Sequence, residues 1–257
     1  MTSPSKDLLA LFDPISLDEM DSVMLLDRVD TKYSFHYSHL NYLLPQLTKH
    51  YRILEIDNVR NMQYESVYFD TPGMELYRLH HCGIQNRMKV RYRKYVESDT
   101  TYFEIKFKNN KGRTVKMRIR DRECNDSISE QANLFLKEHT PFERDILQPA
   151  VKINFLRSTL VNRKVAERVT IDTNLSFALN GTQNQLSHLV VAEVKQDRSS
   201  PSEFVQLMRQ NHLRTGSLSK YCFAVATIYN DIRKNNFKMK IKKLNNLNYD
   251  SAAANCH

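Results

Sequence analysis

The sequence contains few cysteines, and their spacing forms no known site. Its four cysteines, Cys82, Cys124, Cys222 and Cys256, are scattered along the chain without a CxxC pair. A structural zinc site or a disulfide framework normally shows in closely spaced or regularly repeated cysteines. The pattern therefore argues against both, and it fits a reducing compartment best, so we expect a cytoplasmic protein.

Long hydrophobic runs are missing as well. The first residues, MTSPSKDLLALFDP, contain no apolar stretch of the kind found in a signal peptide. No run in the chain approaches the roughly 20 apolar residues that a transmembrane helix needs. We therefore expect neither a cleaved leader nor a transmembrane segment in this sequence.

The usual signatures of nucleotide and hydrolase sites are also absent. The sequence has no Walker loop, no GxGxxG fingerprint, no HExxH motif and no GxSxG elbow. If this protein binds a nucleotide, side chains must hold it in place of a glycine-rich loop.

What the sequence does contain is an excess of positive charge. Its 257 residues suffice for one large domain with a core, and 41% hydrophobic and 26% charged residues are typical of a globular protein. Lysine and arginine number 38 against 29 acidic residues, which gives a formal net charge of +9. This excess favours an anionic partner: a nucleic acid, a phosphorylated small molecule or an anionic membrane.

The positive charge is concentrated in three successive predicted strands, 86–95, 101–108 and 114–120, the last two joined by a predicted hairpin turn at 109–112. Side chains alternate between the two faces of a strand, and one face of these three is apolar. The other face carries the single acid Glu104 together with Arg87, Lys89, Arg91, Arg93, Lys106, Lys108, Lys116, Arg118 and Arg120.

Several interpretations of this basic face are open. An ordinary antiparallel sheet also has one solvated face, but such faces usually mix charges, because like charges directly across two strands destabilise the pair. A uniformly positive face needs an anion, and Arg and Lys on neighbouring strands would hold a chain of phosphates. A nucleic-acid binder is a weaker alternative, because the face lacks the interleaved exposed aromatic residues of a stacking platform.

The other predicted elements alternate between helices and strands. A capping box at Ser16–Glu19 begins a helix, and a second helix begins at Asp70–Pro72 and ends near Gly83. The remaining predicted strands are 28–35, 51–56, 63–69, 165–171 and 189–194. The remaining predicted helices are 38–50, 127–138, 202–213 and 219–232. Residues 147–161 are predicted as a helix that turns into a strand.

Roughly eight strands with interspersed helices predict an α+β fold. An antiparallel sheet closed into a barrel would place one face of every strand inside. With the charged faces inward, the barrel would enclose a cationic tunnel, and flanking helices would cover the apolar outer faces. Residues 1–15 are then an N-terminal extension, 16–233 the tunnel domain, and 234–257 a flexible, loosely ordered tail rich in Lys and Asn.

Two further segments carry residues suited to phosphate chemistry. Glu193 shares a strand face with Lys195, and this carboxylate either balances charge or ligates Mg²⁺ or Mn²⁺, which bind carboxylate and phosphate oxygens together. Glu104 is the second candidate ligand for such a metal. Lys220 follows Ser219 at a predicted helix start, where backbone amides and a lysine could bind a phosphate.

Seven short motifs resemble, in their order, those of the VTC domain. They are RVDTKY at 28–33, SVYFDTPGMELY at 66–77, KVRYRKY at 89–95, FEIK at 103–106, RVTID at 168–172, AEVK at 192–195 and SKY at 219–221. The VTC domain is the catalytic domain of the vacuolar transporter chaperone polyphosphate polymerase, within the triphosphate tunnel metalloenzyme (CYTH-like) superfamily. The ExExK motif of the wider superfamily is absent, which favours the VTC branch over the adenylate cyclase and thiamine triphosphatase branch.

The resemblance implies an antiparallel tunnel barrel that binds triphosphate, ATP as phosphoryl donor, polyphosphate as product, and Mn²⁺ or Mg²⁺ as cofactor. Glu193 matches the metal-binding glutamate of the family. Basic positions of the family match Lys32, Arg78, Arg91, Arg93, Lys106, Lys116, Arg168 and Lys220, with Arg28, Arg118 and Lys195 as secondary matches.

Three functions therefore remain in view. The first is an ATP-dependent polyphosphate polymerase. The second is a hydrolase of triphosphate or nucleoside triphosphate, which would use the same tunnel with water as acceptor. The third is a non-catalytic module that binds polyphosphate or tripolyphosphate. Neither a membrane domain nor an SPX-like sensor is recognisable in this sequence, which weakens the polymerase assignment more than phosphate binding.

Overall fold

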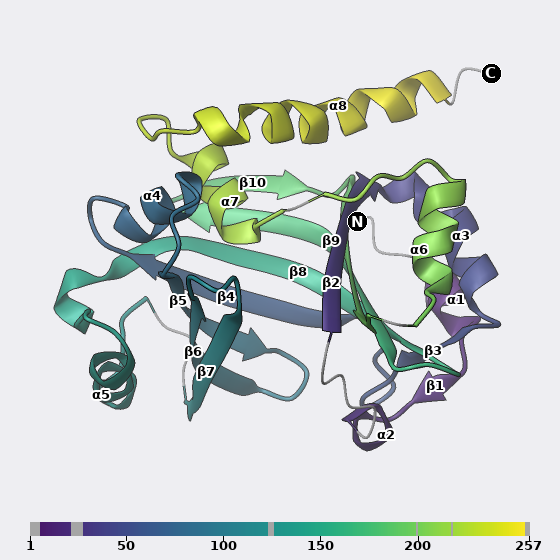
Figure 1. Ribbon diagram of the computed structural model, residues 1–257, viewed down its shortest axis with the longest axis horizontal. Coiled ribbons are helices and arrows are strands. Elements are labelled where there is room, and N and C mark those ends of the chain that lie inside the picture. Colours follow the sequence, from purple (N-terminus) through teal and green to yellow (C-terminus); the bar gives the residue numbers. More distant parts are fainter. Residues whose placement is uncertain (1–5, 22–27, 123–125, 199, 217, 255–257) are drawn as a thin grey trace.

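The computed structural model describes residues 6–21, 28–122, 126–198, 200–216 and 218–254 (Figure 1). Its centre is a single antiparallel path of strands that runs in the order β2-β11-β9-β8-β4-β5-β6-β7. No helix of the described residues is both long and apolar enough to cross a bilayer. The strands of the path are β2 (Arg28–His36), β4 (Met62–Asp70), β5 (Arg87–Tyr95), β6 (Thr100–Lys108), β7 (Thr114–Asp121), β8 (Gln148–Asn162), β9 (Glu167–Leu179) and β11 (Leu189–Asp197).

Three short strands extend this sheet. β1 (Pro14–Ile15) pairs in parallel with β3 (Tyr51–Leu54), β3 pairs with β8, and β10 (Thr182–Leu186) forms a hairpin with β9. The segment 1–15, expected to be an extension, thus contributes a strand to the sheet, and its helix α1 (Lys6–Ala10) brings Leu9 into the core together with Phe12.

The predicted antiparallel α+β fold is confirmed, whereas the predicted closed barrel is not. The sheet curls so strongly that β2 crosses in front of β8 and β9 (Figure 1). Among the described residues, however, no hydrogen-bonded ladder joins the edge strands β2 and β7. The sheet therefore has a concave and a convex face, with a seam between its two edges.

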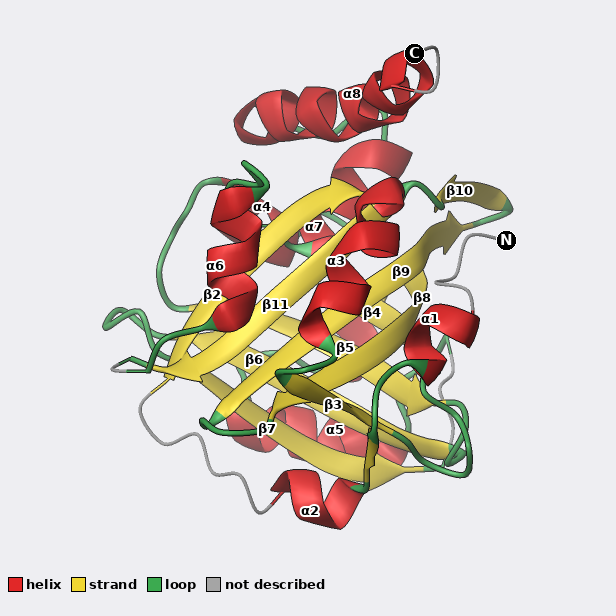
Figure 2. Cartoon of the chain, turned by 90° about the vertical axis from the view of Figure 1, so that its right-hand side faces the viewer, coloured by secondary structure: helices red, strands yellow, loops and turns green. Residues whose placement is uncertain are grey.

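Helices cover the convex face in two groups. α3 (Leu40–Leu47) and α6 (Glu203–Gln210) pack with α1 on the apolar residues of β2, β9 and β11, as Figure 2 shows for α3 and α6 over β11. α5 (Glu130–His139) covers Val90, Tyr92, Phe103 and Ile105 of β5 and β6. The apolar alternation of the basic strands thus faces a core, which leaves their charged side chains on the concave face.

The helix α7 (Lys220–Ile228) fills the concave face at one end of the sheet. All side chains from Tyr221 to Ala226 are buried, and they contact Phe155, Phe177 and Val191 from the inner sides of β8, β9 and β11. Because the sheet surrounds it, α7 is apolar on nearly every side. Its N-terminus lies among the charged residues of the concave face.

Of two predicted helix starts, the structure confirms one and corrects the other. The capping box is confirmed, since Ser16 and Glu19 exchange hydrogen bonds at the start of α2 (Leu17–Asp21). The next helix, α4 (Glu75–His81), begins later than the predicted Asp70–Pro72, because Met74 adopts a left-handed backbone conformation with φ of 54°. Asp70 nevertheless caps this helix, as its carboxylate accepts hydrogen bonds from the backbone of Leu76 and Tyr77.

Two predictions about longer segments are wrong. Residues 147–161, predicted to begin as a helix, form the 15-residue strand β8, whose apolar side chains are buried on both faces. Residues 238–254, expected as a loosely ordered tail, form α8 (Lys238–Ala254), and Ile241, Leu244 and Leu247 pack against the α7 core. Short 3₁₀ helices at Tyr37–His39, Arg144–Ile146 and Asn235–Phe237 complete the fold.

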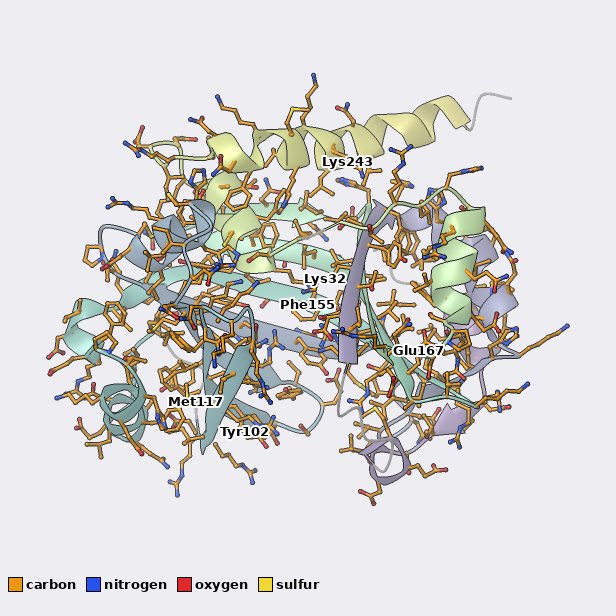
Figure 3. All side chains as sticks on the ribbon, viewed as in Figure 1. Lys32, Tyr102, Met117, Phe155, Glu167 and Lys243 are labelled. Carbon is orange, nitrogen blue, oxygen red and sulfur yellow. The ribbon has the colours of Figure 1, made fainter. Side chains whose placement is uncertain are left out.

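A buried carboxylate at the end of β9 has a structural role. Glu167 is labelled in Figure 3 near α6, away from Lys32 and Phe155 in the centre of the molecule. Its carboxylate accepts hydrogen bonds from Tyr51 Oη, Asn162 Nδ2 and Ser202 Oγ, and Tyr51 Oη accepts one from the backbone of Phe204. Glu167 therefore joins α6 to the sheet and takes no part in the charged concave face.

Candidate phosphate-binding site

The basic side chains of β5, β6 and β7 lie in rows across the concave face. The strand register places Lys89, Lys106 and Lys116 in one row. The next row contains Tyr68, Arg91, Glu104 and Arg118, and the one after it Ser66, Arg93, Tyr102 and Arg120. The prediction that these three strands share one charged face is therefore confirmed.

Glu104 is the centre of a buried ion-pair network. It is 0% exposed, its Oε2 accepts hydrogen bonds from Arg91 Nε at 2.8 Å and Nη2 at 2.5 Å, and its Oε1 lies 2.5 Å from Lys116 Nζ. Arg91 also donates to Tyr68 Oη. Burial acts to raise the pKa of Glu104, but Arg91, Arg93 and Lys116 outweigh it and hold the pKa well below its usual range. Glu104 is thus an internal counterion.

Arg93 and Lys106 are cations without such a counterion. Arg93 is 8% exposed and donates to Ser66 Oγ at 3.3 Å, and neither it nor Lys106 forms an ion pair with any described residue. The Arg91 charge, burial and the Arg93 charge together lower the pKa of Lys106 to about 5. A buried charge normally has a partner, so Arg93, together with Lys106 once it is protonated, has capacity for an external anion.

The opposite wall holds a second ion-pair network, which includes residues that the sequence did not single out. Arg157 on β8 donates to Asp172 on β9 from Nε at 2.6 Å and Nη2 at 2.8 Å, and Lys220 of α7 contacts the same carboxylate. Lys220 also lies 4.7 Å from the ring centre of Phe155. Asp172 thereby fixes two cations side by side at the N-terminus of α7.

Lys89 connects the two walls. Its Nζ donates to Ser219 Oγ at 2.9 Å, and Ser219 caps α7 by accepting a hydrogen bond from the backbone of Cys222. Burial lowers the pKa of Lys89, and the charges of Arg91 and Lys32 lower it further. Since Lys32 belongs to β2 and Arg91 to β5, the first and last parts of the strand path face one another across this site.

Glu193 lies among cations without being tightly bound by them. Its Oε1 is 3.5 Å from Lys32 Nζ and 3.8 Å from Lys195 Nζ, and its side chain is 21% exposed. Burial acts to raise the pKa of Glu193, but Lys195 and Lys32 outweigh it and lower the pKa. These loose, accessible oxygens fit a divalent cation better than those of Glu104. No group of three His, Cys, Asp or Glu side chains converges among the described residues, so phosphate and water would supply the other ligands.

The remaining predicted site residues are distributed unevenly. Arg118 lies on the concave face with its guanidinium carbon 4.4 Å from the ring centre of Tyr102, and Arg168 donates to the backbone carbonyl of Met20. Arg78 is exposed and lines a separate cavity of about 480 Å³ with Tyr229 and Arg233, so the structure does not bring it to the other cations. The side chain of Arg28 lies outside the described residues.

Sequence reasoning missed Arg157, Asp172 and Tyr68 as members of this site. It placed Lys89 on the basic face, because Lys89 alternates with Arg91 and Arg93, but did not name it among the individual phosphate ligands. For Arg157 the signal depended on assigning 147–161 entirely to a strand. Asp172 alternates with Arg168 on β9, but its ion pairs with residues of β8 and α7 could not be inferred from spacing.

A curled antiparallel sheet with a cationic concave face and flanking helices defines an antiparallel α+β fold. The structure is similar to that of a Hippeastrum protein described as a putative adenylyl cyclase with a dominant triphosphatase activity, with a TM-score of 0.51, 10% identity, and coverage of 80% of this chain and 98% of that one. A putative adenylate cyclase from Bacillus halodurans has a TM-score of 0.43, 13% identity, and coverage of 76% of this chain and 96% of that one.

The sequence itself gives the narrower assignment. The VTC domain family model matches residues 27–229, which is most of the chain. The chain therefore belongs to the VTC domain family. No curated protein matches it significantly.

Proposed function

We propose that this protein is a phosphotransferase of the polyphosphate polymerase type, which transfers the γ-phosphoryl group of ATP to a phosphate chain. The observation that carries the proposal is a pair of basic side chains, the buried Arg93 and the partly buried Lys106, that form no ion pair with a described residue and lie beside a row of further cations. A polyanion is the ligand that this arrangement fits best. We expect the edges β2 and β7 to approach around the bound chain and complete a tunnel.

The residues of this face would act mainly by positioning and charge neutralisation, which is what phosphoryl transfer requires of a protein. Lys106, Arg93 and Lys116 would bind phosphate oxygens on one wall. Arg157 and Lys220, preset by Asp172, would bind them on the other. Because these cations are already in place, little reorganisation is needed when the phosphates bind.

Glu193 would hold the divalent metal, Mn²⁺ or Mg²⁺. When bound, the metal would neutralise charge on the transferred phosphoryl group and orient it. The neighbouring Lys32 and Lys195 keep the Glu193 carboxylate ionised, and therefore able to ligate, over the physiological pH range.

Hydrolysis is the second candidate function. The structurally similar Hippeastrum protein is described as a triphosphatase, and the same bound triphosphate could react with water where no phosphate chain occupies the acceptor position. A binding module without catalysis is the third, since the cations alone suffice to bind polyphosphate.

One experiment distinguishes the three functions. The protein is incubated with ATP and Mn²⁺, and long-chain polyphosphate and free phosphate are measured separately. We expect polyphosphate to accumulate together with ADP. Free phosphate without polyphosphate would show a hydrolase, and binding of tripolyphosphate with neither product would show a binding module.

Phosphate binding is expected to be linked to protonation of Lys106. The pKa of Lys106 is about 5 without ligand, so this lysine is largely neutral at pH 7. A bound polyanion raises a lysine pKa, so binding at pH 7 should take up about one proton at this position. Titration calorimetry in two buffers of different ionisation enthalpy measures the uptake, and the Lys106→Met variant should take up about one proton fewer than the parent. Equal uptake by the two proteins would contradict the linkage.

A further inference from the structure

The rows of cations end in a cluster of tyrosines that no part of the phosphate chemistry uses. Tyr64 on β4, Tyr95 on β5 and Tyr102 on β6 lie on the concave face, because each alternates in register with its charged residues. The rings of Tyr64 and Tyr95 are 5.0 Å apart, and those of Tyr95 and Tyr102 are 5.9 Å apart. The sequence interpretation found no exposed aromatic residues interleaved in the basic face; the structure places these three partly buried tyrosines at its end.

These rings contact the cations of the site directly. Arg118 lies over Tyr102 at 4.4 Å, and Arg93 lies over Tyr64 at 5.4 Å. All three tyrosines are only partly buried, and none of the hydroxyl groups of Tyr64, Tyr95 and Tyr102 forms a hydrogen bond with the residues that the structure describes. The partly exposed rings and hydroxyl groups of the cluster are therefore accessible to a ligand beside the phosphate site, whereas the rings of a closed aromatic core would be buried.

The tyrosine cluster lies at the end of the concave face that is farther from α7. Along β5 the row of Lys89 lies beside α7, and the rows of Arg91, Arg93 and Tyr95 follow at steps of about 7 Å. In Figure 3, Tyr102 lies at the β6–β7 side of the molecule, far from α8. Because α7 fills the concave face at its other end, a substituent on a triphosphate bound by Arg91, Arg93 and Lys106 would extend away from α7, along the rows toward the tyrosines.

We propose that Tyr64, Tyr95 and Tyr102, together with Arg118, form the subsite for the nucleobase of a nucleoside triphosphate. A base would stack on Tyr102 next to the Arg118 guanidinium, while its phosphates occupy the adjacent cation rows. Aromatic stacking and arginine contacts accept any base, since every base has a π face. The subsite would thus bind nucleoside triphosphates without strong selection among bases. This inference rests on the proposed function, because it takes a triphosphate as the ligand of the cationic face.

The test compares two ligands that share the phosphates and differ in the base. Affinities for ATP and for inorganic tripolyphosphate are measured by titration calorimetry on the parent and on Tyr102→Leu, Tyr102→Phe and Tyr42→Leu, the last as a control on the outer helix α3. We expect Tyr102→Leu to weaken ATP binding by about 5- to 100-fold and to leave the affinity for tripolyphosphate within about twofold of the parent's. Tyr102→Phe should retain ATP affinity, because it keeps the ring.

If Tyr102→Leu weakened the binding of both ligands equally, or changed the affinity for neither, the proposed nucleobase subsite would be overturned. If Tyr102→Leu does not fold, proton cross-relaxation between adenine H2 or H8 and tyrosine rings of the parent decides instead: contacts support the subsite, and their absence overturns it. A parent that binds neither ligand refutes the proposed function itself. A parent that binds both, with an unchanged ratio in Tyr102→Leu, refutes the nucleobase subsite alone.

Discussion

Glu193→Gln is expected to lower metal-dependent turnover of ATP by at least about 100-fold while leaving the fold intact, since metal assistance amounts to several kcal/mol of the barrier. Glutamine keeps the shape of the side chain but loses the charge that attracts a divalent cation. Tripolyphosphate binding without metal should be unchanged or tighter, because one negative charge is removed from between Lys32 and Lys195. The measurement is the rate of ATP turnover against Mn²⁺ concentration.

Glu65→Gln is the matched control, since Glu65 lies on the opposite face of β4, where it accepts a hydrogen bond from Gln63. A Glu193→Gln variant with the parent's rate and metal dependence would show that Glu193 is no metal ligand. Turnover that survives alongside a changed melting temperature would show that Glu193 only balances charge. Glu104 would then be tested next, although its ion pairs with Arg91 and Lys116 leave its carboxylate little freedom.

The double variant Arg93→Met/Lys106→Met is expected to weaken tripolyphosphate binding by at least about 100-fold, and each single variant by about 10- to 100-fold. Methionine retains an unbranched apolar stem, so packing against Tyr64 and Ser66 is largely kept. Arg93 is buried, Lys106 is partly buried, and neither forms an ion pair with a described residue, so removal of the Arg93 charge relieves its repulsion with Arg91. The melting temperature should therefore stay constant or rise while affinity falls.

Lys94→Ala is the control for this pair, because Lys94 lies next to Arg93 on the other face of β5 and pairs with Asp99. Binding constants come from calorimetry and stability from thermal unfolding. Unchanged affinity in the double variant would exclude both residues as ligands. A large loss of stability would instead assign them a structural role and remove the main observation behind the proposed function.

The basic strands could be predicted from sequence because only one of their faces is buried. Alternation is then unambiguous, and it placed Arg91, Arg93 and Lys106 on one side of the sheet correctly. β8 was mispredicted because both of its faces are buried: Phe155 packs on α7, while Leu160 packs on the outer helices. A run that is apolar on both faces has no period by which to distinguish strand from helix.

The tail was mispredicted for a different reason. Lysine and asparagine dominate α8 in number, but Ile241, Leu244 and Leu247 recur at helical spacing and pack against the buried α7 core. The prediction of a loosely ordered tail was based on the average composition of the segment, which does not reveal these three regularly spaced apolar residues. Likewise, no spacing rule could show that Asp172 would hold Arg157 and Lys220, since the three come from different elements that only the fold brings together.

The seam between β2 and β7 would give a bound polyanion a mechanical role. The two edge strands are joined by no ladder among the described residues, yet each carries a basic side chain of the concave face, Lys32 on β2 and Lys116 on β7. A chain of phosphates that contacts both would act as a removable clasp across the gap. Loading and release could then occur sideways, by parting of the two edges, so that a long polymer would not have to be threaded end-first past the helix α7.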